Sequence, residues 1–199
     1  MNTLILMIAM CADAPSGGMP IGMQDYFERA DAARANIEKI HTTKISDLEI
    51  AIRGERNPSK KANLRRELNR VENSYGDLKR SKVFAYMPKS PAVGTIGVFG
   101  VAEVVAVIDD KSVLVIVGDS VDQMQKQVTP VLITGIATKS LKARERIHST
   151  ETWRVTDTAV DDEVVLRRLS ETDKKHLYSV EAVPKREIEK YRSEYVASK

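Results

Sequence analysis

Cysteine is almost absent from this sequence, because Cys11 is the only one in 199 residues. A lone cysteine cannot form a disulfide within the chain, and it cannot build a zinc site from cysteine ligands. The three histidines, His41, His148 and His176, are scattered over different segments and form no recognisable ligand pattern. We therefore predict no metal site.

Aromatic residues are also scarce, at 5% of the chain, so a folded core must rest mainly on Val, Ile, Leu and Ala. No run approaches the roughly 18 consecutive apolar residues that a membrane-spanning helix needs. The formal net charge of +3 is too small to indicate, by itself, binding to nucleic acid or to an anionic membrane. With 42% hydrophobic and 30% charged residues, the composition is typical of a folded chain with one medium domain or two small ones.

The motifs of common enzymes are missing as well. The sequence has no Gly-x-Ser-x-Gly elbow and no Asp-x-Asp-x-Asp-Gly calcium loop. Its acidic pairs, Asp109-Asp110 and Asp161-Asp162, are more typical of solvated turns than of ligand sites. We therefore predict no catalytic, cofactor-binding or metal-binding residues and interpret the protein as non-enzymatic. A site assembled from residues that are remote in the sequence remains an alternative.

An apolar run at residues 3–12 is followed by the helix breakers Pro15, Gly17 and Gly18. This order is typical of the hydrophobic region and cleavage zone of a signal peptide, and it predicts export. Two features depart from that pattern: the run is short, and the first basic residue is Arg29. An uncleaved apolar N-terminus that packs on the domain is the alternative.

Within this run, Cys11 is a candidate site of lipidation. The preceding residues Ile8-Ala9-Met10 resemble the box before the lipidated cysteine of lipoproteins, although Met10 stands where a small residue is expected. A lipid there would anchor the mature protein to a membrane through its N-terminus. Ordinary cleavage nearby, without lipidation, is the alternative.

Residues 23–82 show the three-or-four-residue spacing of apolar positions that is typical of amphipathic helices. In the first helix we expect Asp25 to act as the N-cap, and Gly54 with Pro58 to end the helix. Ser59 is the expected cap of the second helix. The apolar positions are Phe27, Ala30, Ala33, Ile37, Ile40, Ile45, Leu48 and Ile52, and then Leu64, Leu68, Val71, Tyr75 and Leu78. Two such helices joined by a short turn predict an antiparallel, coiled-coil-like hairpin.

The second helix of this hairpin is basic. Residues 59–82 contain eight Lys or Arg against three Asp or Glu, a surplus of five positive charges. Five of these cations form a candidate surface for an anionic partner, such as phosphate groups or anionic lipid: Lys60, Lys61, Arg65, Arg66 and Arg70. The alternative is a solvated helix face whose charge is balanced by acids on a neighbouring helix.

Apolar β-branched residues concentrate between Val93 and Gly135, after a Pro-rich linker at 87–91. The expected strands are 101–108, 112–117, 128–134, 152–156, 164–166 and 177–183. In the third of them, Pro130 favours a sheet edge or a bulge, because proline has no N–H to donate. A short helical turn after Gly135 is expected to cover one end of the strand-rich unit.

Gly94, Gly97 and Gly100 stand three residues apart, and Asp119 follows about 20 residues later, as in dinucleotide-binding loops. The spacing departs from Gly-x-Gly-x-x-Gly, however, and β-branched residues follow where the phosphate-binding helix should begin. We therefore interpret the glycines as corners and close backbone approaches, and we predict no bound cofactor. The polar segment 119–127 is a better candidate for a binding loop.

Together these patterns predict an α+β fold. A coiled-coil-like helical hairpin is followed by a small SH3-like or OB-like antiparallel β-barrel, with a sandwich as the alternative. A C-terminal helix begins at Pro184 and has Ile188, Tyr191 and Tyr195 on its apolar side. The expected units are a leader and linker at 1–22, the hairpin at 23–82, the β-rich domain at 83–183 and the C-terminal helix at 184–199.

This order of segments, with a turn from Thr138 to Leu141 after Gly135, resembles certain uncharacterised exported bacterial proteins over about residues 93–160. The resemblance implies export and a helical segment before a small β-barrel. It implies no activity and no transferable site.

We accordingly expect a non-enzymatic exported protein of the periplasm, cell envelope or extracellular space, acting as a structural or protein-interaction module. Its expected partner is a protein, either a second copy or another envelope component. Membrane attachment is expected only through a retained N-terminal anchor. The alternative is a cytoplasmic nucleic-acid-binding barrel assisted by the basic helix.

Overall fold

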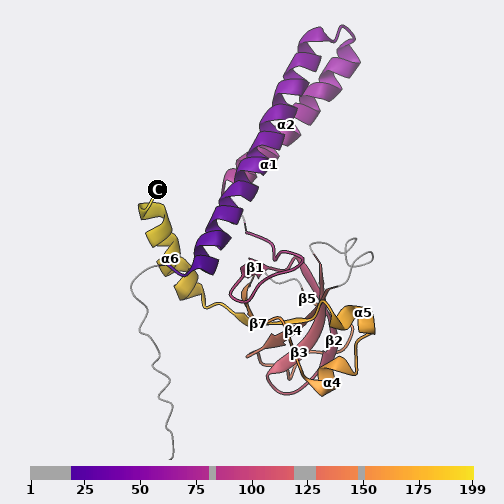
Figure 1. Cartoon of the computed structure of the whole chain (residues 1–199). Coiled ribbons are helices and arrows are strands. Elements are labelled where there is room, and N and C mark those ends of the chain that lie inside the picture. Colours follow the sequence, from indigo (N-terminus) through magenta and orange to yellow (C-terminus); the bar gives the residue numbers. More distant parts are fainter. Residues whose placement is uncertain (1–18, 81–83, 119–128, 148–150) are drawn as a thin grey trace, which may run out of the picture.

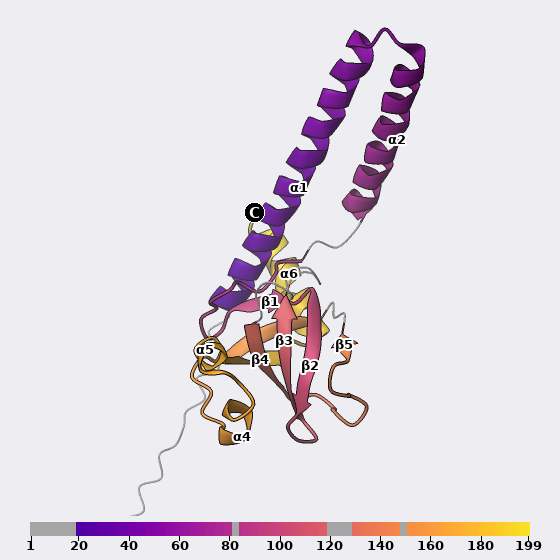
Figure 2. The same ribbon diagram turned by 90° about the vertical axis from the view of Figure 1, so that its right-hand side faces the viewer.

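A computed structural model of the chain describes residues 19–80, 84–118, 129–147 and 151–199. The described elements, in chain order, are α1 (Ile21–Gly54), α2 (Pro58–Arg80), β1 (Ile96–Val98), β2 (Val101–Val107), β3 (Ser112–Gly118), β4 (Thr129–Thr134), β5 (Arg146–Ile147), β6 (Thr152–Asp157), α4 (Glu163–Leu166), α5 (Glu171–Lys174), β7 (Tyr178–Ala182) and α6 (Lys185–Ala197). The two long helices form a hairpin that projects from the unit built by the strands, which we call the sheet unit (Figures 1 and 2). The predicted α+β class, with an N-terminal helical region and a C-terminal helix, is confirmed.

The hairpin begins and turns at positions that differ slightly from the expected ones. Asp25 does not cap α1, because the helix starts four residues earlier, after Pro20, with no side-chain cap. Asp25 instead pairs with Arg29 one turn later, at 2.8 Å. At the second helix Asn57, rather than Ser59, is the cap, since its side-chain oxygen accepts hydrogen bonds from the backbone N–H of Ser59 and of Lys60.

One apolar stripe of α1 serves two different partners. Near the start of the helix, Tyr26 and Phe27 are buried against the sheet unit and α6. Farther along, Leu48 is buried on the side of α1 that packs on α2, where Val71 is buried. The three-or-four-residue spacing keeps these positions on one helix face, so the same stripe anchors the helix and builds the hairpin.

The seven described strands form one sheet in the order β1-β6-β7-β4-β3-β2-β5. The predicted closed antiparallel barrel is not confirmed. The sheet is open, with β1 and β5 at its two edges, and β4 pairs with β7 in parallel. A parallel pair needs a long connection between its strands, and residues 135–177 supply it, with β5, β6, α4 and α5 along the way.

The open sheet still encloses a core. Side chains from strands that lie far apart in the sheet order, such as Val104 of β2 and Trp153 of β6, belong to the same buried cluster. A flat sheet could not bring them together, so the sheet curls around this cluster. Trp153 is buried there. On the opposite face, Leu114 and Leu132 pack against Val165 of α4.

Several strand predictions are confirmed. The hairpin of β2 and β3 has its turn at 109–111, where the backbone N–H of Lys111 donates to the Asp109 side chain at 2.7 Å. Pro130 was expected at a sheet edge or a bulge and lies at neither, because β4 lies between β3 and β7 and pairs with β3 in continuous register. The proline is tolerated because pairing with β7 begins one residue later, at Val131, so no N–H is needed toward that neighbour.

The expected strand at 164–166 is a short helix, α4. Asp162 causes this outcome, since its carboxylate accepts hydrogen bonds from the backbone N–H groups of Val164 and Val165. The helical turn expected after Gly135 is also not formed. The backbone turns there instead, with Thr138 buried and the N–H of Leu141 donating to its carbonyl at 2.9 Å.

The hairpin is joined to the sheet unit by apolar packing and by hydrogen bonds. The apolar part, which we call the base cluster, consists of Met23, Tyr26, Phe27, Ala85, Ile96, Val183 and Tyr195. Arg29 donates hydrogen bonds to the backbone carbonyls of Tyr86 and Ile96, so one side chain of α1 holds two neighbouring chain segments. These contacts fix the direction in which the hairpin leaves the sheet unit.

Candidate functional site

A hollow of about 590 Å³ lies between the two helices of the hairpin. We call it the hairpin groove. Its lining residues are Ile40, His41, Lys44, Asn63, Arg66, Glu67, Arg70, Val71 and Ser74. The groove therefore combines several cationic side chains with apolar ones.

Helix geometry explains why these residues share one groove. On α2, Asn63, Arg66, Arg70 and Ser74 follow each other at intervals of three or four, which places them on one side of the helix. On α1, the contributing residues from Ile40 to Lys44 occupy about one helical turn. Antiparallel pairing of the two helices then sets these two short rows opposite each other.

The charges in the groove are only partly balanced. Lys44 of α1 and Glu67 of α2 form an ion pair of 3.2 Å across the groove. Arg66 and Arg70 are exposed and have no ion-pair partner within the described residues. The groove thus keeps two uncompensated guanidinium groups, each able to bind a carboxylate or phosphate with paired hydrogen bonds.

The structure separates the five cations that the sequence singled out. Arg66 and Arg70 line the groove, whereas Lys60, Lys61 and Arg65 do not. Arg65 lies about 100° around the helix from Arg66, which directs it away from the groove. Side chains of the later cations of α2, and residue 82, lie outside what the structure describes.

Sequence reasoning missed the contribution of α1. Lys44 and His41 belong to the groove, and His41 also stacks on Tyr75 of α2 with ring centroids 5.7 Å apart. The position of the turn at 55–57 could have predicted that Lys44 and His41 lie near this part of α2. Residues at similar distances before and after the turn of an antiparallel hairpin lie near each other, as Lys44 and Glu67 do.

The groove also has an apolar part. Val71 is buried in its floor, and Ile40 is 58% exposed at its rim. An isoleucine that exposed, beside unpaired arginines, suits contact with a molecule that is itself both apolar and anionic. The lining thus offers charged and apolar binding groups side by side.

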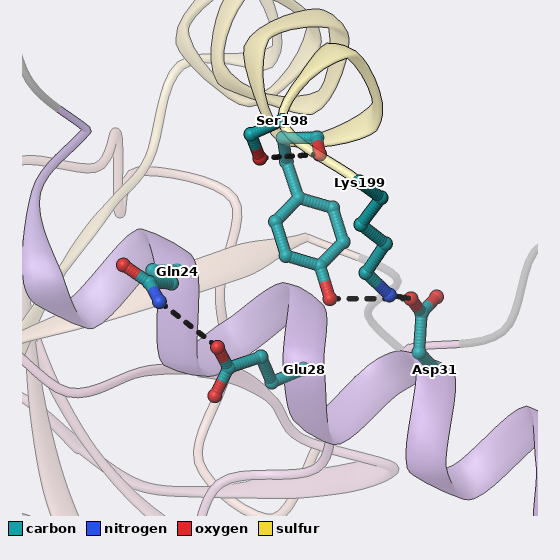
Figure 3. A network of polar contacts seen from close by, with 6 residues as sticks. Gln24, Glu28, Asp31, Ser198 and Lys199 are labelled. Carbon is teal, nitrogen blue, oxygen red and sulfur yellow. Dashed lines mark hydrogen bonds and ion pairs between the residues drawn. The ribbon is translucent and has the colours of Figure 1, made fainter.

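A second, smaller hollow of about 110 Å³ lies at the base of the hairpin, between α1 and α6. There Asp31 accepts hydrogen bonds from Lys199 and from the Tyr195 hydroxyl, the latter at 3.2 Å (Figure 3). The hydrogen bond from Lys199 holds the pKa of the Asp31 carboxyl below its ordinary value of 3.8. Through these hydrogen bonds Asp31 connects α1 to the C-terminal end of the chain, and Arg34 and Arg192 also line the hollow.

Burial changes the acidity of two tyrosines in the fold. Desolvation raises the pKa of the Tyr178 phenol and, opposed by a hydrogen bond with Thr152, that of Tyr26. Both phenols belong to buried apolar clusters, so they serve packing.

Other predicted sites cannot be placed. The apolar run, the candidate lipidation site Cys11, the polar segment 119–127 and His148 lie outside the described residues. Across the described ranges, no group of three or more His, Cys, Asp or Glu side chains is placed to hold a metal ion. None of the described helices has both the length and the apolar character needed to cross a bilayer.

Comparisons with known proteins leave the groove as the basis for a functional interpretation. No family model, no curated protein and no solved structure matches this chain.

Proposed function

We propose that this protein is a non-enzymatic, exported interaction module whose hairpin groove binds another protein. The observation that carries the proposal is the groove itself, where Arg66 and Arg70, unpaired among the residues that the structure describes, line the same hollow as the exposed Ile40. A surface with charged and apolar groups side by side is typical of protein recognition sites.

The way the hairpin is mounted supports this role. The base cluster and Arg29 fix α1 on the sheet unit, from which the hairpin projects (Figure 2). The groove lies farther along the hairpin, at residues 40–44 of α1 and 63–74 of α2. Attachment at the base sets the direction of the hairpin before a partner binds, which lowers the cost of orienting it and favours affinity. The sheet unit then acts as the support from which the arm projects.

The experiment for binding uses a photocrosslinking amino acid in place of Ile40, in the full chain and in its native cells. We expect a discrete adduct with another protein, and we expect it to disappear when Arg66→Ala and Arg70→Ala are added. The control position is Ile50, an isoleucine of the same helix that is 63% exposed and outside the groove. Equal adducts from both positions, or none from Ile40, would overturn the proposal.

Export is a separate part of the proposal and rests on the apolar run at 3–12. A reporter enzyme that is active only outside the cytoplasm is fused after residue 25. We expect activity from this fusion, and a silent fusion would remove the export part. The mass of the mature N-terminus then distinguishes cleavage, lipidation of Cys11 and retention of the run.

Nucleic-acid binding is the second candidate, favoured by the same unpaired arginines. With Arg66 and Arg70, about two phosphate contacts are available, so the logarithm of affinity should fall with a slope of only about −1.8 against the logarithm of salt. Binding of mixed-sequence DNA or RNA at about 50 mM salt, lost in Arg66→Ala with Arg70→Ala and kept in Arg65→Ala, would support this candidate. No detectable binding at that salt would end it.

A further inference from the structure

We propose that the partner segment in the hairpin groove is an acidic amphipathic helix, which packs against α1 and α2 as a third helix. This inference rests on the proposed interaction function and specifies the chemistry of the partner. It excludes a second copy of this chain and a nucleic acid as the occupant of the groove.

The length of the groove along α2 suits a short helix. Its lining on α2 extends from Asn63 to Ser74, which is about 16 Å at 1.5 Å per residue. A partner helix of about 11 residues covers this length. The lining side chains are spaced three and four apart, so they form the ridges between which another helix packs.

The apolar part of the groove is incomplete without a third element. Where α1 and α2 pack on each other, Leu48 and Val71 are the buried side chains within the described residues, each still 8% exposed. Two helices alone cannot surround a core, and Ile40 is left 58% exposed beside Val71. Apolar residues of a third helix at i, i+3 or i+4 would cover Ile40.

The positive charge of the groove determines that the partner should be acidic. Arg66 and Arg70 stand one helical turn apart with no ion-pair partner among the described residues, and the Lys44–Glu67 pair is already balanced. Two carboxylates one turn apart on the partner helix match the spacing of the two guanidinium groups. An acidic face next to an apolar stripe is therefore the complementary pattern.

The same charges disfavour a second copy. A two-fold symmetric dimer through this groove places Arg66 and Arg70 of one chain against the same groove of the other, where the excess positive charge is repeated. Like charges at contact distance repel and cost affinity. A nucleic acid fits less well for another reason: Ile40 and Val71 add nothing to contacts with a phosphate backbone.

The test is a display library of helical peptides of about 15 residues with random outward positions, selected against the full-length protein. We expect the enriched peptides to be net acidic, with apolar residues at i, i+3 and i+4. Arg66→Ala with Arg70→Ala should weaken their binding by at least about tenfold, and Ile40→Asp should do the same. Arg65→Ala with Lys60→Ala, two cations of the same helix outside the groove, should leave affinity within about twofold.

Three results would overturn the inference. Enriched peptides that are neutral or basic would show that Arg66 and Arg70 do not determine which peptides bind. The same conclusion would follow if peptide affinity fell equally in the control variant, Arg65→Ala with Lys60→Ala. Mixed-sequence single-stranded DNA that binds more tightly than every selected peptide would point to nucleic acid. A wild-type dimer in sedimentation equilibrium that Ile40→Asp dissociates would point to a second copy.

Failure of this inference can be told apart from failure of the proposed function. An adduct at Ile40 in cells without an enriched acidic helix refutes the helix and leaves protein binding in place. Enriched acidic helices without an adduct at Ile40 in cells refute the proposed function.

Discussion

At the scale of single residues, two glycines show how closely backbone segments approach in this protein. A Cβ atom on Gly22 would lie 2.1 Å from the carbonyl oxygen of Gly94, where α1 meets the chain just before β1. A Cβ on Gly97 would lie 2.7 Å from the Cα of Met87. Neither distance is tolerated, so the predicted role of Gly97 as a close backbone approach is confirmed. The glycines of this region serve packing of the backbone.

The first prediction tests the close contact between the backbone at Gly97 and that at Met87. Gly97→Ala should destabilise the protein by about 1–3 kcal/mol, because the new methyl group displaces the backbone at Met87. Gly76→Ala is the matched control, since a Cβ there meets nothing within 4 Å and alanine favours the helix interior, adding about 0.5–1 kcal/mol. Urea unfolding of both variants measures the difference. Equal stabilities would contradict the close approach.

The second prediction concerns Asp31, whose pKa is lowered chiefly by the hydrogen bond from Lys199. The Asp31 carboxyl has a lower pKa in the folded chain than its ordinary value of 3.8 in the unfolded chain, so in acid the unfolded chain takes up the proton more readily. The stabilisation from its hydrogen bond with Lys199 is therefore complete above pH 3.8 and is lost as the pH falls through the pKa of the folded state. In Asp31→Asn, the unfolding free energy should therefore fall less steeply with acid. Unfolding in urea from about pH 6 to pH 2 measures this slope.

Lys199→Ala should reproduce part of that change, because it removes the main donor to Asp31 while Tyr195 remains. An Asp31→Asn variant with the acid slope of the wild type would show that this hydrogen bond does not stabilise the fold in solution.

At the scale of elements, the hairpin is the part of the protein with the thinnest core. Leu48 and Val71 are buried between its helices within the described residues, whereas the sheet unit buries many side chains in its main cluster. Segments with few buried apolar contacts unfold locally at a lower free energy than segments with many. The hairpin should therefore unfold locally before the sheet does, and a third helix in the groove would stabilise it.

The third prediction uses two apolar residues of α1. Leu48→Ala should cost about 2 kcal/mol and accelerate amide hydrogen exchange over the outer hairpin, while exchange in β3 and β4 stays slow. Ile50→Ala should change stability by less than about 0.5 kcal/mol, because Ile50 is 63% exposed. Hydrogen exchange with mass spectrometry measures both. Exchange that rises equally in hairpin and sheet would show that the two unfold as one unit.

At the scale of the whole molecule, the base cluster decides how the hairpin and the sheet unit are held together. Phe27 of α1 stacks on Tyr195 of α6 with ring centroids 5.2 Å apart, next to Ile96 of β1. Residues near the start and the end of the described chain thus meet the first strand in one cluster. An arm attached in this way keeps a constant direction.

The fourth prediction loosens this attachment. Phe27→Ala should destabilise the protein by about 3–5 kcal/mol and increase its largest dimension in small-angle X-ray scattering, because the hairpin is no longer held. Ile21→Ala, at an isoleucine of the same helix that is 88% exposed, is the control and should change neither property. An unchanged scattering curve in Phe27→Ala would show that the contacts of Arg29 and α6 are enough to hold the hairpin on the sheet unit.

The sequence alone determined the local structure of this protein. The three-or-four-residue spacing from Phe27 to Leu78 predicted the two long helices, and runs of β-branched residues predicted β2, β3, β4, β6 and β7. Such patterns report which face of an element meets a core, and they depend on neighbours in the chain. Where a local signal was misread, as at 164–166, a nearby cap explains the error, since Asp162 starts a helix there.

Only the tertiary structure decided which elements meet. The open sheet, the parallel pairing of β4 with β7 and the interior place of Pro130 depend on contacts between residues far apart in the sequence, which leave no periodic signal. The groove is decided in the same way. Five cations of α2 were equivalent in the sequence, and the packing of α1 selected Arg66 and Arg70 by placing Lys44 and Ile40 beside them.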